Sequence, residues 1–238
     1  IRAEGEALRA ALREAGARPW PDPERLVGVP GMSALPRALA AGLDVTCGVT
    51  VARLAREAAG WFVEQDGPFD GVLLTVPAPQ AIPLAPAFAE PLSRIRYAPC
   101  WTAMLIFPER LPLPDTLRPD GHAIGWAARD SSKPGRDATQ EAWVVQAGPA
   151  FSRAHLEETP EAVLPRLLAA FADLAGLALP APGYAAAHRW RYSLLEAPLG
   201  EPCLWDPALG LGYASDGCLG GRVEAAWDSG AALAAAIG

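Results

Sequence analysis

Apolar residues recur at helical spacing in several parts of the chain. Leu8 and Leu12 lie four residues apart within Ala3–Ala15, which predicts an amphipathic helix there. A longer helix is expected over Pro160–Leu174, where the repeating apolar residues are Val163, Leu167, Leu168 and Phe171. Two further helices are expected, one around Leu35–Leu43 and one from Val223 onward.

Short apolar runs separated by turn residues predict strands in the rest of the chain. The expected strands are Leu26–Val29, Asp44–Cys47, Val49–Arg56, Gly60–Gln65, Phe69–Val76, Ile95–Phe107, His122–Arg129, Ala142–Ala147, Tyr184–Leu194 and Leu209–Ala214. Ala58-Ala59-Gly60 suits a hairpin connection, and Pro77 and Pro79 should end the strand before them. Because Val72–Val76 is continuously apolar apart from one threonine, we expect it to be buried on both faces of a sheet. Strands with few helices in the middle and a strand–loop–helix unit at the end predict an α/β fold with α+β character.

Composition and charge exclude several classes of partner. The chain has 238 residues and a formal net charge of −7, so nucleic acid is not an expected partner. No apolar run reaches the roughly 18 residues of a membrane span, and no signal peptide is visible. The four cysteines are far apart and form no C-x-x-C pair, which favours reduced thiols and a cytoplasmic location. Residue 1 is isoleucine, so we expect a processed form or a fragment.

The common cofactor-free chemistries have no motif in this sequence. There is no G-x-S-x-G nucleophile elbow, no G-x-x-x-x-G-K-[ST] loop and no H-E-x-x-H pair. The histidines, His122, His155 and His188, are well separated, and no metal site is predicted from them. A hydrolase hypothesis is therefore poorly supported, and no catalytic residue is assigned.

The segment from Leu209 to Gly230 has the strongest functional pattern. A strand leads to Asp216, a glycine-rich loop follows, and a helix begins near Val223. Such a loop lets the backbone approach a ligand, and the free N–H groups of the helix start attract negative charge. The Asp216 carboxylate could accept hydrogen bonds from sugar-type hydroxyls. An ordinary strand–turn–helix remains the alternative.

This segment resembles the closing FAD motif of the amine oxidase and renalase-like flavoproteins. The resemblance implies FAD as the cofactor and a hydrogen bond from Asp216 to its ribityl–phosphate region. It also implies that the backbone of the helix start faces the pyrimidine edge of the flavin, where the helix N-terminus would stabilise negative charge on the reduced ring. The implied cofactor-binding residues of this segment are Asp216, Gly220, Gly221, Arg222, Val223 and Glu224.

Other stretches resemble the renalase-like group in the same order along the chain. On the cofactor side they are Val29–Pro36, Thr46–Val51 and Phe69–Gln80. By this resemblance the backbone of Val51 contacts adenine and Pro77 lies near the cofactor. On the substrate side they are Tyr97–Met104, Ser132–Arg136 and His188–Tyr192.

Aromatic residues of the substrate-side stretches could wall a flat pocket. We expect Trp101, His188 and Trp190 to bind substrate, with Trp126 and Trp143 as further candidates. The alternative is that strand tryptophans belong to the core. Because side chains alternate along a strand, His188 and Trp190 should share one face and Arg189 and Arg191 the other. Either face could line a pocket for an anionic nucleotide, and the alternative is a solvated strand face. Lys133 and Arg136 flank a predicted turn in the Ser132–Arg136 stretch, and the alternative to a role on the substrate side is that they are plain surface charges.

Several positions depart from the family pattern. The G-x-G-x-x-G unit that holds the FAD pyrophosphate is absent from the 238 residues. Ser215 replaces a glycine, which could strain a turn that needs positive φ, and Gly217 replaces a bulky residue. Asp228 stands where an apolar residue is more common.

The resemblance implies an FAD-dependent oxidoreductase built from two interlocked domains. The expected activity is oxidation of a dihydronicotinamide dinucleotide, with hydride transfer to the flavin and reoxidation by oxygen. The alternatives are a flavin amine oxidase and a truncated or degenerate relative that serves as a binding scaffold. The expected boundaries are 1–25 for a helix and linker of the substrate domain, 26–85 and 201–238 for FAD-binding parts, and 86–200 for the mixed-sheet substrate domain.

Overall fold

The computed structural model describes all 238 residues, which form two compact units. Unit 1 contains residues 1–8, 40–96 and 195–238, and unit 2 contains residues 9–39 and 97–194. Helix α1 (Glu6–Glu14) and strands β7 (Arg96–Phe107) and β11 (Tyr184–Ala197) each continue from one unit into the other. The expected fold class is confirmed: mixed and antiparallel sheets alternate with helices in an α/β arrangement.

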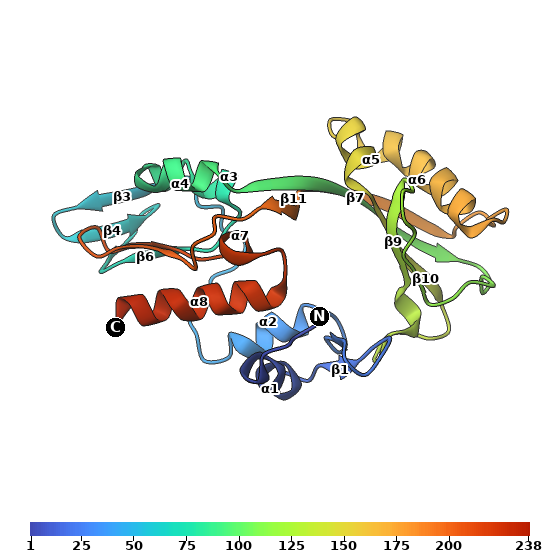
Figure 1. The fold of residues 1–238 in the computed structure, drawn as a ribbon, viewed down its shortest axis with the longest axis horizontal. Coiled ribbons are helices and arrows are strands. Elements are labelled where there is room, and N and C mark those ends of the chain that lie inside the picture. The colour runs from blue at the N-terminus through green and yellow to red at the C-terminus, as the bar shows by residue number, and fades with distance from the viewer. The chain divides into compact units, whose positions relative to one another are not determined.

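Unit 1 contains two three-stranded sheets and several helices (Figure 1). The first sheet is antiparallel and has the order β3 (Leu54–Glu57), β4 (Gly60–Val63), β5 (Asp66–Phe69). The second has the order β12 (Leu204–Asp206), β13 (Leu211–Tyr213), β6 (Val72–Leu74). Its helices are α3 (Ala78–Ala81), η1 (Pro86–Phe88), α4 (Ala89–Ser93), α7 (Asp216–Leu219) and α8 (Val223–Ile237).

Two local sequence features fix these sheets. The expected hairpin is confirmed, since Glu57 pairs with Gly60, whose φ of 139° is open only to glycine. Strands β13 and β6 run parallel, with Tyr213 opposite Leu74. A Cβ atom on Gly212 would come within 2.7 Å of a Leu73 methyl group and 3.0 Å of a Leu233 methyl group. Glycine at this position therefore lets α8 pack closely on the sheet.

Three strand predictions in unit 1 need correction. Residues 44–47 form no strand and are exposed, and of Val49–Arg56 only the last three residues are in a strand. Their β-forming side chains have no adjacent strand to pair with, and Glu64 instead accepts the N–H groups of Ala52 and Arg53. Strand β6 is an edge strand and Leu73 is 48% exposed, so the expected burial on both faces is wrong.

Unit 2 is built around a five-stranded antiparallel sheet. Its order is β11, β7, β10 (Glu141–Ala147), β9 (Ile124–Arg129), β8 (Thr116–Leu117). Helices α5 (Pro149–Ala154) and α6 (Pro160–Ala175) lie together beside this sheet in Figure 1. Smaller elements are β1 (Arg18–Pro19), β2 (Leu26–Val27), α2 (Ala34–Leu39) and η2 (Asp130–Ser132).

Helix α6 closes one face of this sheet, as its periodicity predicted. The Thr159 hydroxyl accepts the Ala162 N–H, and Gly176 ends the helix with φ 64°. Its buried side chains pack against alternate residues of the sheet; the ring centroids of Phe171 and Trp143, for example, are 5.4 Å apart. The core members contributed by the strands include Trp101, Ala103, Leu105, Phe107, Ala127, Trp143 and Val145.

A buried ion pair fastens the loop that follows β7. Arg129 is 1% exposed, and its Nε donates to Glu141 Oε1 at 3.0 Å. Its other nitrogens donate to Asp115 and to the carbonyl oxygens of Leu111 and Leu113. The guanidinium carbon also lies 4.8 Å from the centre of the Trp143 ring. Every donor direction of this arginine is thus directed at protein, which marks it as structural.

Candidate functional site

The end of strand β13 leads into an ordered turn at Ser215. Ser215 has φ −165°, which is ordinary extended backbone, so the expected strain is not present. Its hydroxyl accepts the Gly217 N–H at 3.0 Å and donates to the Tyr213 hydroxyl at 2.8 Å. Its backbone N–H donates to Ser229 Oγ at 3.0 Å. Serine at this position therefore holds the start of α7 against α8.

Residues 215–222, expected to be a loop, contain the short helix α7, and Asp216 is its first residue. The Asp216 side chain is half-buried and forms no ion pair. Burial raises the pKa of this carboxyl, and the opposing hydrogen bond from the Gly217 N–H only partly offsets the effect. A half-buried carboxyl without a counter-ion is a candidate acceptor for ligand hydroxyls.

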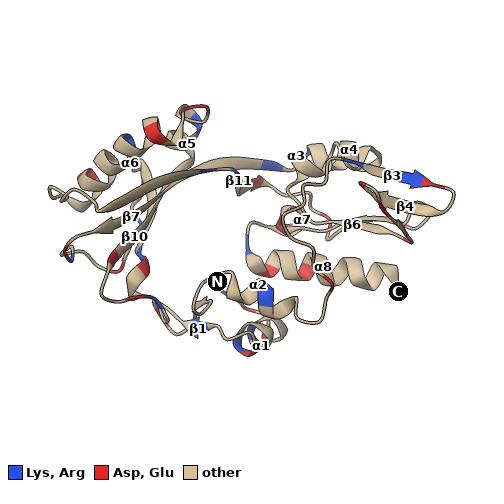
Figure 2. Ribbon diagram, turned by 180° about the vertical axis from the view of Figure 1, so that it is seen from behind, with Lys and Arg blue, Asp and Glu red and all other residues tan.

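Helix α8 begins close behind Asp216, and no side chain caps it. The Gly220 N–H donates to the Asp216 carbonyl at 2.9 Å, and Arg222 is the N-cap residue without a side-chain cap bond. The two acidic side chains of the helix are Glu224 and Asp228, and it has no basic one (Figure 2). An uncapped N-terminus of a fifteen-residue helix attracts an electron-rich group.

Glu224 and Gly221 determine what surrounds the start of α8. Buried Glu224 turns its carboxylate to the backbone N–H groups of Glu4 and Gly5, at 2.9 and 2.5 Å. A Cβ atom on Gly221 would come within 3.1 Å of Leu195 Cβ, so glycine is needed for this approach. The Glu224 carboxylate is therefore bound by the protein itself and holds residues 4 and 5 against the start of α8.

Pro77 and Asp216 follow neighbouring parallel strands at the same offset. Leu74 pairs with Tyr213, and each of the two residues comes three positions after its member of that pair. Both therefore lie at the carboxyl edge of the sheet, where ligands of α/β proteins bind. Val51 lies outside any strand, is partly exposed, and its main-chain N–H and C=O have no hydrogen-bond partner in the protein. These groups fit the needs of a nucleotide cofactor.

In unit 2 the sheet face opposite the core presents a row of polar and aromatic side chains. Gln146 pairs with Trp126 on one side and with Thr102 on the other. The register of β8 and β9, in which Thr116 pairs with Ala128, places Arg118 opposite Trp126 when continued by two residues. Four neighbouring strands thus contribute Arg118, Trp126, Gln146 and Thr102 to one row.

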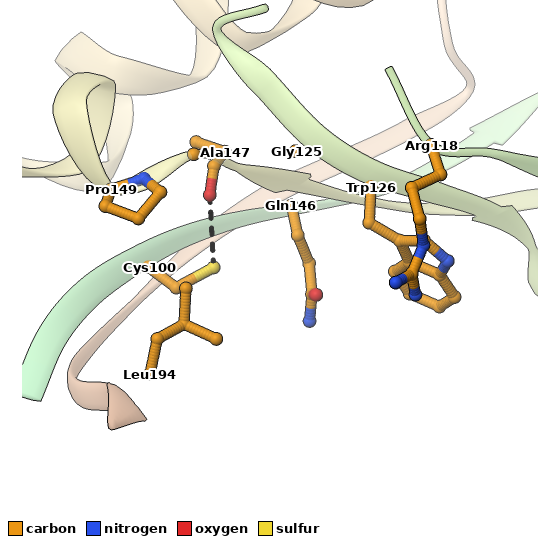
Figure 3. A pocket seen from close by; sticks show the side chains of 9 residues that line it. Cys100, Arg118, Gly125, Trp126, Gln146, Ala147, Pro149 and Leu194 are labelled. Atoms are coloured by element: carbon orange, nitrogen blue, oxygen red, sulfur yellow. Dashed lines mark hydrogen bonds between the residues drawn. The ribbon is translucent and has the colours of Figure 1, made fainter. Parts of the chain in front are cut away.

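A pocket of about 480 Å³ opens on this row (Figure 3). Figure 3 shows Arg118 beside Trp126, Gln146 next to them, and the Cys100 sulfur turned toward the Ala147 carbonyl above Leu194. Gly125, Ala147, Gly148 and Pro149 complete the lining. No acidic side chain lines this pocket, although the chain as a whole is acidic.

The polar groups of the pocket are unpaired with one exception. Arg118 forms no ion pair, and the Gln146 carboxamide and the Trp126 indole N–H form no hydrogen bond within the protein. The exception is Cys100, whose thiol donates to the Ala147 carbonyl at 3.6 Å. Burial raises the pKa of this thiol, so it stays protonated at neutral pH and is not a nucleophile.

The predicted substrate residues do not all lie together. Trp101 has no exposed surface, and its indole N–H donates to the His155 carbonyl at 2.9 Å; the core alternative therefore describes it. His188 and Trp190 share one face, as the alternation predicts, with ring centroids 4.4 Å apart. Both are exposed.

Arg189 and Arg191 lie on the face of β11 opposite to His188 and Trp190. Arg191 forms an ion pair with Glu157 at 2.8 Å, and Arg189 donates to the Leu156 carbonyl and lies 5.8 Å from the Trp101 ring centre. Because this face meets the core, the exposed His188 and Trp190 belong to the same side as the pocket.

The alternative of plain surface charges at Lys133 and Arg136 does not hold. Their side chains are only 10% and 15% exposed, and both form ion pairs with Asp130. The Lys133 ammonium lies 5.2 Å from the Trp20 ring centre and 5.8 Å from that of Trp126. The Lys133 ammonium is therefore held near Trp126, although it does not line the pocket.

Sequence reasoning did not find Arg118, Gln146 and Cys100. Gln146 offered a weak signal, because it is the one neutral polar residue in an otherwise apolar strand end. Arg118 offered none, because its strand has only two residues. No group of three or more histidine, cysteine or acidic side chains could hold a metal ion, and no helix is long and apolar enough to cross a membrane.

A family model for flavin-containing amine oxidoreductases matches residues 21–237. The chain belongs to this family. Membership in the amine oxidoreductase family implies FAD as the cofactor, and it agrees with the uncapped α8 beside Asp216.

Solved structures with this fold are similar over nearly the whole chain. A candidate protoporphyrinogen oxidase from Exiguobacterium sp. 255-15 has a TM-score of 0.71 and 19% identity, over 96% of this chain and 57% of its own. The cyclohexylamine oxidase of Brevibacterium oxydans IH-35A has a TM-score of 0.66 and 16% identity, over 99% and 57%. An oxidoreductase from Methanosarcina mazei has a TM-score of 0.60 and 16% identity, over 86% and 53%. The chain thus spans little more than half the length of these amine oxidoreductase folds.

Proposed function

We propose that this chain is part of an FAD-dependent oxidoreductase that oxidises a small molecule and is reoxidised by oxygen. The observation that carries the proposal is the uncapped start of α8 directly behind the half-buried Asp216 at the carboxyl edge of the β13–β6 pair. When bound, FAD would supply the hydride acceptor and the reaction with oxygen.

The residues of unit 1 would hold the cofactor without doing covalent chemistry. Asp216 would accept hydrogen bonds from ribityl hydroxyls, and its lack of a counter-ion leaves it available for them. The first backbone N–H groups of α8, at Val223 and Glu224, would bind the electron-rich edge of the ring. The unpaired main chain of Val51 suits the edge of adenine, which has one donor and one acceptor side by side.

The finer proposal concerns the molecule that is oxidised. The resemblance of Tyr97–Met104 and His188–Tyr192 to renalase-like proteins favours a dihydronicotinamide dinucleotide. A simple amine is the second candidate, and the similarity in fold to a cyclohexylamine oxidase favours it. In either case the protein positions a C–H bond next to a nitrogen atom, which needs orientation rather than an acid–base pair.

The proposal applies to a protein that also supplies a pyrophosphate-binding unit. No G-x-G-x-x-G stretch lies within residues 1–238, and the chain spans 57% of the first two related structures. A chain without such a unit would be the binding scaffold considered above.

Measurement of flavin binding tests this function. The test variant is Asp216→Ala. The control is Asp228→Ala, which removes an exposed carboxylate from α8. The purified full-length protein should be yellow and release FAD on denaturation. Loss of a charge-assisted hydrogen bond should weaken FAD binding of D216A by about tenfold or more, whereas D228A should bind like the wild type. Colourless protein that does not take up added FAD would contradict the proposal.

Anaerobic mixing separates the two substrate classes. Bleaching of the flavin band by dihydronicotinamide isomers, and not by cyclohexylamine, would support the dinucleotide. The opposite pattern would support the amine.

A further inference from the structure

We propose that the pocket on the open face of the unit 2 sheet is a carboxylate subsite, so that the molecule bound there carries a carboxylate on a planar or apolar body. Calling that molecule a substrate depends on the proposed function; the binding itself does not.

The cross-strand row places hydrogen-bond donors side by side. Trp126 and Gln146 are paired on adjacent strands, and Arg118 directly follows β8 at the position that continues its register opposite Trp126. The guanidinium, the indole N–H and the carboxamide N–H₂ are all donors, and none has a partner in the protein. Donors that line one pocket and have no partner in the protein can bind a ligand that brings acceptors, and the Gln146 carboxamide can turn its N–H₂ toward such a ligand.

The charge of the pocket selects an anion. Arg118 is the charged residue in the lining, and no aspartate or glutamate lines the space. The Lys133 ammonium, 5.8 Å from the centre of the Trp126 ring, shares the Asp130 carboxylate with Arg136, so this group of charges has no net negative charge that would repel an anion. A free ammonium group would meet the uncompensated guanidinium and be disfavoured.

The shape and number of the groups select a carboxylate with an attached body. The planar guanidinium matches the two oxygens of a carboxylate, and a single cation matches a single negative charge. Trp126, Leu194 and Pro149 provide aromatic and aliphatic wall beside it. A volume of about 480 Å³ falls in the range of small-molecule sites. Of the two candidates under the proposed function, the subsite favours the amine, as an amino acid or another carboxylate-bearing amine rather than a plain alkylamine.

Three indole ligands that differ only in the end group test this inference. Indole-3-acetate is the anion, indole-3-acetamide the neutral analogue and tryptamine the cation. Isothermal titration of the intact protein should give tightest binding for the acetate and weakest for tryptamine. Arg118→Gln should weaken acetate binding by about tenfold or more and leave the acetamide unchanged.

Arg37→Gln is the matched control, because Arg37 is likewise exposed, forms no ion pair and belongs to unit 2. The inference is overturned if the acetate does not bind, if the three ligands bind equally, or if R37Q weakens acetate as much as R118Q. Since Arg118 is exposed and unpaired, its replacement is not expected to unfold the chain, and circular dichroism would confirm this.

The titration needs no flavin, so the two proposals fail independently. A colourless protein that binds indole-3-acetate through Arg118 would retain the subsite and lose the oxidoreductase. A yellow protein indifferent to the acetate would retain the oxidoreductase and lose the subsite.

Discussion

The two faces of the unit 2 sheet carry the same residue types and use them in opposite ways. On the α6 face Trp101 and Trp143 are fully packed, and Arg129 has all its donors bound. On the other face Trp126 and Trp190 are partly exposed and Arg118 is unpaired. The residue names alone do not separate the faces.

This difference indicates which polar groups are structural. Those whose hydrogen-bond partners lie within the protein stabilise the fold, and those without such partners are available to a ligand. An arginine buried against two carboxylates holds a loop in place and cannot also meet a ligand. An exposed arginine whose donors are bound only by water can exchange that water for a ligand. The faces should therefore differ in how mutations act: on stability for one, on binding for the other.

The largest expected effect is on the buried arginine. Arg129→Met leaves the buried Glu141 carboxylate with only the exposed Arg110, 3.9 Å away, as counter-ion and should lower the free energy of unfolding by about 3 kcal/mol. Arg118→Met should change it by less than about 0.5 kcal/mol. Urea unfolding of both variants measures this, and equal losses would break the contrast between the faces.

A tryptophan pair sharpens the same contrast. Trp101→Ala empties a fully buried site and breaks the bond to the His155 carbonyl, so we expect a loss of about 3 kcal/mol. Trp190 is 54% exposed, and Trp190→Ala should cost under about 1 kcal/mol. If W190A proved as destabilising as W101A, the open face would be a second core.

The sequence predicted what local chemistry determines. The α6 helix has its own cap at Thr159, its own stop at Gly176 and a repeating apolar stripe, so its limits were readable. The α8 helix and the alternation of His188 and Trp190 were predicted for similar reasons. The cofactor-side residues came from a resemblance carried by short motifs.

Structural features that depend on residues far away in the sequence could not be predicted. Val45 and Val49 favour strands, but no neighbouring strand pairs with them. The four-residue helix α7 depends on Ser215 capping Gly217 and on Ser229 of another helix. The Arg118–Trp126–Gln146 row exists only through the register of three strands separated by loops.

A smaller effect, on the pH dependence of stability, is expected at Asp216, whose carboxyl is half-buried and has no counter-ion. Burial raises its pKa in the folded state above the unfolded value. The stability that this group contributes is therefore present below the unfolded pKa and is lost as pH rises through the folded pKa.

The D216N variant has no ionisable side chain at this position, so it does not lose this stability as the pH rises. The urea midpoint of D216N relative to wild type should rise from acid toward neutral pH, and the exposed Asp228→Asn serves as the control. If the urea midpoint of D216N relative to wild type stayed constant or fell over this pH range, burial would not be the main influence on the Asp216 pKa.

The most direct test of the contrast between the faces is a titration of indole-3-acetate followed by the indole N–H resonances of ¹⁵N-labelled tryptophans. The Trp126 resonance should shift progressively with ligand and the Trp101 resonance should not, with assignments from single Trp→Phe variants. A titration in which Trp126 stays fixed, or in which the buried Trp101 shifts as much, would contradict the assignment of the open face as the binding face.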